Sequence, residues 1–311
     1  MLRPFGLRPT RRSESASMVV GVIDVGANTV RLLVAKRRKS SLFRVHEERE
    51  LLGLGEEVEA LGYIPPEKLT RASAIARDLA EHARSLGCAT VEILVTSPGR
   101  QAANGEELRE ALELECGVGA RILSADEEAS LAYSGALSAV RSDWETVAVV
   151  DVGGGSAQLI VGTARSGPVW ARSVDIGSLR LTRRVLASDP PAAGELAAAR
   201  AEVERSFAGM APPLPQAALA TGGTARALRR IVGRRRLDAR DVARAIDELT
   251  TRSSGQLVRR YGLEPERART LPAGALILAE AQRRLSLPIE VARGGVREGA
   301  ALALLAERAA A

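Results

Sequence analysis

Apolar and polar positions along the chain form two similar patterns, the second 127 positions after the first. Residues 21–35 read GVIDVGANTVRLLVA, and residues 148–162 read AVVDVGGGSAQLIVG. Each copy is an apolar run that ends in Asp, a turn of Gly and other small residues, and a second apolar run. This arrangement predicts two short strands joined by a tight turn. The repetition predicts a chain built from two related domains.

Between and beyond the two hairpins, strand patterns alternate with helix patterns. Over residues 67–86, apolar side chains recur every three or four positions behind two prolines, which predicts an amphipathic helix. Shorter patterns predict strands at 91–95, 121–123, 169–174, 217–220 and 289–292, and helices that begin near 104, 124, 222 and 296. This alternation predicts an α/β fold.

The pattern also indicates where the domains divide. We expect the first domain at residues 18–142 and the second at 143–311, because Arg141-Ser142-Asp143 interrupts the alternation. The final helix either stays in the second domain or returns to the first. Residues 1–17 carry four Arg against one Glu and lack the apolar stretch of a signal peptide. We expect them to be a disordered tail or an incorrectly assigned start of translation.

Composition and charge narrow the classes of partner. With 46% hydrophobic and 26% charged residues, the 311-residue chain is typical of a globular protein with two domains. Half of the net charge of +6 lies in residues 1–17, and only 3% of residues are aromatic, so we expect no nucleic-acid partner. No apolar run is long enough to span a membrane, so we expect a cytoplasmic protein.

Several common catalytic and metal-binding arrangements are not expected. Cys88 and Cys116 are each alone in their neighbourhoods, so neither a disulfide framework nor a zinc knuckle is predicted. His46 and His82 are likewise unpaired in the sequence, which makes a histidine-based triad or metal cluster improbable. None of the three lysines follows glycines in a Walker A pattern, which excludes a P-loop ATPase.

The two predicted turns have the composition of phosphate-binding sites. Small residues allow backbone N–H groups to converge on an anion. Asp24 and Asp151 enter the two turns and would repel phosphate unless a hard cation lay between them. Mg²⁺, with Mn²⁺ as an alternative, would resolve this conflict. A single such hairpin could equally be an ordinary β-turn, but two aligned copies favour the phosphate interpretation.

Five motifs follow one another along the chain: DVGANTVRLLV at 24–34, TSPGRQAAN at 96–104, ILSADEEASLAYSG at 122–135, DVGGGSAQLIVG at 151–162 and GGVREGAAL at 294–302. In this order they resemble the Ppx/GppA family of exopolyphosphatases and guanosine pentaphosphate phosphohydrolases. The resemblance implies two actin-like (ribonuclease H-like) domains with a cleft between them, as in the actin, Hsp70 and sugar-kinase superfamily. It also implies Mg²⁺-dependent release of terminal phosphate from polyphosphate or guanosine pentaphosphate. The chain is similar to the short, two-domain members.

The resemblance also implies roles for individual residues. It places the catalytic base at Glu128, whereas Glu127 is expected to close a capping box with Ser124. Metal binding is expected at Asp24 and Asp151. Phosphate contacts are expected from Gly26, Asn28, Thr29, Arg31, Arg100, Gly153, Gly154, Gly155 and Ser156.

Two positions leave questions open. Gln158 stands where family members generally carry Glu, which helps to hold metal or water; an amide can orient water but brings no negative charge. Asn104 either belongs to the phosphate-contacting motif or caps the next helix in a capping box with Glu107.

Other functions remain as alternatives. With Gln158 in place of an acid, the protein could be a non-catalytic sensor of polyphosphate or a guanosine alarmone. A kinase or ATPase of the same superfamily would require adenosine recognition near residues 222–226, whose glycine turn resembles a nucleotide-binding turn. The sequence does not distinguish polyphosphate from guanosine pentaphosphate, and a homodimer stays open.

Overall fold

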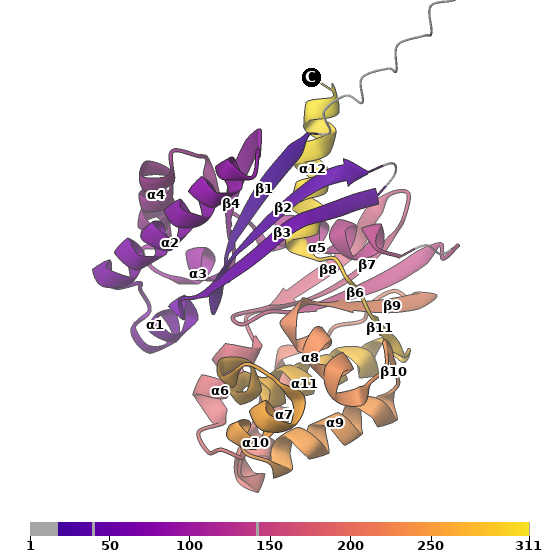
Figure 1. The fold of residues 1–311 in the computed structure, drawn as a ribbon. Coiled ribbons are helices and arrows are strands. Elements are labelled where there is room, and N and C mark those ends of the chain that lie inside the picture. Colours follow the sequence, from indigo (N-terminus) through magenta and orange to yellow (C-terminus); the bar gives the residue numbers. More distant parts are fainter. Residues whose placement is uncertain (1–17, 39–40, 141–142, 311) are drawn as a thin grey trace, which may run out of the picture.

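The computed structural model describes residues 18–38, 41–140 and 143–310, which form two mixed β-sheets covered by helices (Figure 1). The predicted extension at 1–17 and the predicted domain boundary at residue 142 lie outside the described residues.

The first sheet has the strand order β3-β2-β1-β4-β5. The first hairpin supplies β1 and β2, β3 pairs antiparallel with β2, and β4 and β5 are parallel to β1. The strands are β1 (Val19–Val25), β2 (Thr29–Arg38), β3 (Ser41–Leu51), β4 (Thr90–Val95) and β5 (Ala120–Ile122). The sequence pattern did not predict β3, because this edge strand is rich in charged residues and is largely exposed.

The second sheet repeats this arrangement and adds one short strand at its edge, in the order β10-β11-β9-β6-β7-β8. The second hairpin supplies β6 and β7, β8 pairs antiparallel with β7, and β9 and β11 are parallel to β6. The strands are β6 (Thr146–Val152), β7 (Ala157–Thr163), β8 (Gly167–Val174), β9 (Ala217–Thr221), β10 (Arg236–Leu237) and β11 (Ile289–Val291). The shared strand order confirms the predicted α/β class with two related sheets.

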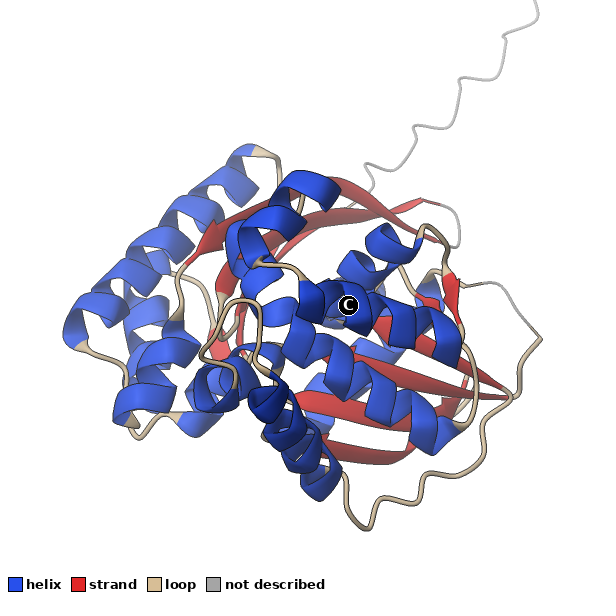
Figure 2. Ribbon diagram, turned by 90° about the horizontal axis from the view of Figure 1, so that it is seen from below, coloured by secondary structure: helices blue, strands red, loops and turns tan. Residues whose placement is uncertain are grey.

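Helices cover the strands of both sheets (Figure 2). Those before the second hairpin are α1 (Leu54–Leu61), α2 (Pro66–Ser85), α3 (Ser97–Gln101), α4 (Gly105–Cys116) and α5 (Ala125–Ser138). Apolar side chains of α2 and α4 pack with β1, β2 and β4 in one core. The amphipathic helix predicted at residues 67–86 is confirmed as α2. It begins at Pro66, and proline is favoured at the first position of a helix.

The remaining helices belong mainly to the second half of the chain. They are α6 (Ser178–Val185), α7 (Ala193–Ser206), α8 (Gly222–Val232), α9 (Ala239–Thr251), α10 (Ser254–Tyr261), α11 (Pro265–Leu285) and α12 (Val296–Ala310). In Figure 1, α6–α11 gather on the far side of the second sheet, where α11 runs through the largest apolar core.

Two helices lie between the sheets. Residues of α12 pack with β1 and β2 of the first sheet, although this helix ends the chain, while α5 packs against β6 and β7 of the second sheet. The two helices cross closely at Gly135 and Gly299, where an added Cβ would collide with backbone of the other helix. This pair therefore joins the two sheets and holds their hairpin turns near one another.

No helix in the described part of the chain combines the length and the apolar character needed to cross a membrane.

Candidate active site

The two hairpin turns have the same backbone geometry. In the first turn, between β1 and β2, the amide of Gly26 donates to the carbonyl of Thr29 at 3.0 Å. In the second turn, between β6 and β7, the amide of Gly153 donates to the carbonyl of Ser156, also at 3.0 Å. The sequence repeat thus produces a structural repeat at the positions predicted to bind phosphate.

Both turns open into one cavity between the sheets. Ten predicted site residues line it: Asp24, Gly26, Asn28, Thr29, Arg31, Glu128, Asp151, Gly153, Gly154 and Ser156. Three others, Arg100, Gly155 and Gln158, are not in the lining. Gly155 packs closely against Ser97 at the start of α3, whereas Arg100 and Gln158 contact lining residues from behind.

Asp24 and Asp151 occupy equivalent positions near the ends of β1 and β6. Burial raises the pKa of Asp24, and burial together with the charge of Asp24 raises the pKa of Asp151 to about 6. Oδ1 of Asp24 is buried without a hydrogen-bond partner among the described residues. Two close carboxylates with an unsatisfied oxygen fit a hard divalent cation, because Mg²⁺ and Mn²⁺ prefer oxygen ligands.

The backbone of the glycine turn at 222–223 lies directly beside the carboxylate of Asp151. Gly222, at the start of α8, has a φ of +86°, and a Cβ added there would lie 2.7 Å from Oδ1 of Asp151. Only glycine adopts this conformation readily and leaves room for the carboxylate. The glycine turn that resembled a nucleotide-binding motif therefore shapes the acidic part of the cavity.

Glu128 lies in the first turn of α5 and is 7% exposed. Burial raises its pKa to about 7, while the charge of Arg100 opposes the rise. Nη2 of Arg100 donates to Oε2 of Glu128 at 2.6 Å, and Nη1 donates to the carbonyl of Leu123 at 2.7 Å. A carboxylate with a pKa near neutrality, held at the cavity wall, can accept a proton from water.

The neighbouring Glu127 has a different structural role. Its Oε2 accepts from the amide of Ser124 at 2.8 Å, and its own amide donates to Ser124 Oγ at 3.2 Å. This confirms the predicted capping box and leaves Glu128 as the member of the pair that faces the cavity.

The hydroxyl of each turn is contacted by the residue two positions later. Nε of Arg31 donates to Oγ1 of Thr29 at 3.0 Å, and Nε2 of Gln158 donates to Oγ of Ser156 at 3.1 Å. Arg31 and Gln158 are equivalent in the repeat, and each pairs across the hairpin with the aspartate of its own strand pair. Gln158 is 2% exposed, so it supports the second turn from within the sheet.

The capping box expected at Asn104 is not formed. Asn104 is the N-cap residue of α4, but its side chain makes no capping hydrogen bond. Instead, Oδ1 accepts from the amide of Ile64 at 2.8 Å, and Nδ2 donates to the carbonyl of the same residue at 2.9 Å. The side chain of Asn104 thus binds the backbone of the segment before α2. Its oxygen accepts a hydrogen bond there and not from the first amides of α4.

Four charged residues in the cavity lining were missed by the sequence prediction: Arg226, Arg267, Arg297 and Glu298. The guanidinium groups of Arg226 and Arg267 have no hydrogen-bond or ion-pair partner among the described residues. The first follows the glycine turn of α8, and the second lies near the start of α11. Arg297 and Glu298 lie within the quoted GGVREGAAL motif, which was the available signal for them.

The arginines make this part of the cavity suitable for an anion. Burial, with the nearby charges of Arg297 and Arg226, lowers the pKa of Arg31 to about 9. Burial and the charge of Arg226 likewise lower the pKa of Arg267 to about 10. Both guanidinium groups stay charged at neutral pH, and a phosphate between them would relieve their mutual repulsion.

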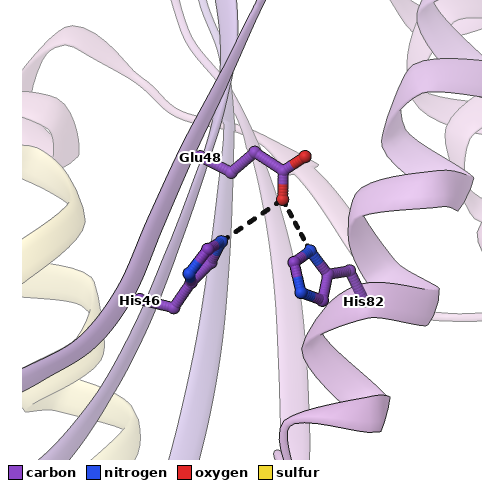
Figure 3. A group of neighbouring side chains, drawn as sticks. All are labelled: His46, Glu48 and His82. Atoms are coloured by element: carbon purple, nitrogen blue, oxygen red, sulfur yellow. Dashed lines mark hydrogen bonds and ion pairs between the residues drawn. The ribbon is translucent and has the colours of Figure 1, made fainter.

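The expectation that the two histidines are unpaired is wrong. The rings of His46 and His82 have their centroids 4.7 Å apart, and Glu48 contacts both (Figure 3). They are 36 positions apart in the sequence, one on a strand and the other on a helix. Their proximity therefore depends on how these two elements pack, which the local sequence pattern does not show.

Comparisons with known proteins identify the family and the fold of this chain. The model of the Ppx/GppA phosphatase family matches residues 33–308. Exopolyphosphatase 2 of Mycobacterium tuberculosis is 30% identical over 299 residues, covering 86% of this chain and 90% of that protein. The crystal structure of an exopolyphosphatase-like protein is similar with a TM-score of 0.84 at 26% identity, covering 95% of this chain and 99% of that one. The Aquifex aeolicus Ppx/GppA family member has the same fold, with a TM-score of 0.79 at 22% identity and coverage of 94% and 98%.

Proposed function

The chain belongs to the Ppx/GppA phosphatase family, and we propose that it is a Mg²⁺-dependent exopolyphosphatase that releases terminal phosphate from inorganic polyphosphate. The observation that carries the proposal is one cavity in which two equivalent turns, two aspartates and Glu128 meet a group of arginines. Mn²⁺ is the alternative cation.

The cavity wall favours polyphosphate over guanosine pentaphosphate. None of the described residues in the lining is aromatic, so a guanine base would find no stacking surface there. Arg226 and Arg267 instead offer guanidinium groups that can each bind phosphate oxygens bidentately. Both arginines lie beside the glycine turn at 222–223, where a kinase would need to recognise adenosine. Guanidinium groups at this place favour phosphate binding over adenosine binding.

In the proposed reaction, Glu128 orients a water molecule and accepts its proton as the water oxygen bonds to the terminal phosphorus. The bond from phosphorus to the bridging oxygen breaks, and its electron pair stays on the shortened chain. Backbone amides of the two turns and the hydroxyls of Thr29 and Ser156 bind the phosphoryl oxygens. Because Glu128 is present in the cavity as a candidate base, we favour a hydrolase over a non-catalytic sensor of polyphosphate.

Asp24 and Asp151 would hold the cation. Bound there, Mg²⁺ would offset the negative charge that the terminal phosphates bring to the two carboxylates. Arg100 acts through Glu128, by fixing the carboxylate that receives the proton.

Phosphate release by the purified full chain tests this proposal. The protein is offered long-chain polyphosphate, guanosine pentaphosphate and ATP separately, each with Mg²⁺ and with a chelator. We expect the highest kcat/KM for polyphosphate and loss of release in chelator. Faster release from guanosine pentaphosphate would overturn the substrate assignment, and binding of polyphosphate without release would favour a sensor.

A further inference from the structure

A second group of metal-ligating side chains lies outside the phosphate cavity. His46 and Glu48 are two positions apart on β3 and so lie on the same face of the strand, and His82 reaches them from α2 (Figure 3). None of the three lines the cavity that contains Asp24. Their ligand atoms all lie within 4.8 Å of one another.

The donor atoms point at one place. Oε2 of Glu48 lies 2.6 Å from Nδ1 of His82 and 3.4 Å from Nε2 of His46. A cation bound by these three atoms would take the place of the contacts between the rings and the carboxylate, and each ligating ring nitrogen would bind it in its unprotonated form.

Two imidazoles and one carboxylate are the donors of a transition-metal site. With bonds of about 2.0–2.1 Å, ligand atoms around a tetrahedral Zn²⁺ are about 3.3 Å apart. The three atoms need to move by at most about 1.5 Å to reach that spacing. Imidazole nitrogen selects Zn²⁺ and related first-row cations over Mg²⁺.

The surroundings allow a cation to enter. The three side chains are 34%, 35% and 40% exposed for His46, Glu48 and His82, so water can reach the site and complete the coordination. We propose that His46, Glu48 and His82 form a binding site for a divalent transition metal such as Zn²⁺, which links the edge strand β3 to helix α2.

The test uses the tag-free full chain after treatment with a chelator. To remove binding at the phosphate cavity, the measurements are made in an Asp24→Asn/Asp151→Asn background. Calorimetric titration with Zn²⁺ should show one equivalent bound, and Co²⁺ should give the visible spectrum of nitrogen-ligated Co²⁺. Saturating Zn²⁺ should raise the Tm by about 3 °C or more.

Single substitutions assign the ligands. His46→Gln and His82→Gln should each weaken Zn²⁺ binding at least ~10-fold, as expected for the loss of one ligand. Glu81→Gln, at the exposed position next to His82 on α2, is the matched control and should bind like the background protein. Unchanged affinity in both histidine variants, or no Zn²⁺ bound by the folded background protein, would overturn the proposal.

A measurement on the unaltered chain covers the case in which a variant does not fold. The chain contains only two histidines, so imidazole resonances report on this site alone. Stoichiometric Co²⁺ should shift or broaden the ring resonances of both histidines together. Imidazole resonances that do not respond to Co²⁺ would overturn the proposal.

Discussion

The guanidinium of Arg100 holds the carboxylate of Glu128, with Nη2 placed 2.6 Å from Oε2. Because Nη1 is bound to the carbonyl of Leu123, the guanidinium has a fixed orientation and can fix the carboxylate in turn. Arg100 itself was expected to contact phosphate, as part of the motif TSPGRQAAN, but in the structure it is not in the cavity lining. Its effect on the reaction should therefore pass through Glu128.

Replacing Arg100 should change both the rate and its pH dependence. Arg100→Gln removes a positive charge that lowers the pKa of Glu128, so that pKa rises above about 7. A general base must be deprotonated, so the acidic limb of the pH–kcat profile should move to higher pH. We expect kcat at pH 7 to fall about 10-fold or more.

Arg100→Lys is the matched control for that experiment. A lysine keeps the charge but cannot donate to Glu128 and Leu123 in the same fixed geometry. Its kcat should fall while the acidic limb stays near its original pH. A profile that moves equally in both variants would contradict a role for the charge.

Substitution of the two adjacent glutamates should separate catalysis from stability. Glu128→Gln should lower kcat by about 10² or more, because the amide cannot accept the proton. Glu127→Ala should keep most of the activity and lower the free energy of unfolding by about 1 kcal/mol through the loss of the capping box. Phosphate release and urea denaturation measure the two effects, and equal kinetic losses would refute the assignment.

Local sequence signals predicted the parts of the site that are continuous in the chain. The repeated hairpins, the capping box of Glu127 and the glycine turn at 222–223 are each encoded within a few residues. Arg267 could not be found in this way, because it reaches the cavity from α11 and is one of many arginines in that region. The edge strand β3 was missed for a related reason: its charged residues gain their partners from distant segments, as Glu47 does from Arg297.

The two aspartates should link stability to pH and to Mg²⁺. Burial raises the folded-state pKa of Asp24 and Asp151, the latter to about 6, so the folded chain binds more protons than the unfolded chain between about pH 4 and 6. This contribution to stability is present below the unfolded pKa and is lost as pH rises through the folded pKa. In chelator, an Asp24→Asn/Asp151→Asn chain lacks this loss, so its Tm should rise relative to that of the unaltered chain as pH increases across this window.

Mg²⁺ should reverse that loss. The cation competes with protons for the carboxylates, so it should raise the Tm by several degrees at pH 8 and by less at pH 5. Asp24→Asn should reduce the Mg²⁺ effect, whereas Asp126→Asn, an exposed position in the first turn of α5, should not. Equal Mg²⁺ effects in all three proteins would mean that the cation binds elsewhere.

The arginines without protein partners should contribute to substrate binding. Arg226→Gln and Arg267→Gln each remove a guanidinium from the cavity wall, so kcat/KM for polyphosphate should fall about 10-fold or more, mainly through KM. Arg229→Gln, on the same helix as Arg226 but outside the lining, removes the same charge and should change kcat/KM little. Matching losses in all three variants would indicate a general charge effect instead of direct contacts.

Gln158 offers the last and sharpest test of the second turn. Its amide donates to Ser156 Oγ, and its backbone pairs directly with that of Asp151 across the hairpin. Gln158→Glu would add a buried negative charge beside that carboxylate. In chelator this should lower the Tm, because two buried carboxylates repel one another. With a cation present the added charge should be favourable, so Mg²⁺ should restore the Tm and reach its half-maximal effect on kcat at a several-fold lower concentration.

A second buried glutamine provides the control for that substitution. Gln282 on α11 is 4% exposed and donates to the carbonyl of Leu237, outside the phosphate cavity. Gln282→Glu should lower the Tm because it also buries a charge, but Mg²⁺ should not restore it because Gln282 does not line the cavity that contains Asp24 and Asp151. Measuring Tm and phosphate release against Mg²⁺ for both variants distinguishes the two cases. If Mg²⁺ restored neither variant, residue 158 would lie beyond the influence of the cation, and the Glu-to-Gln difference from the family would have no effect on metal affinity.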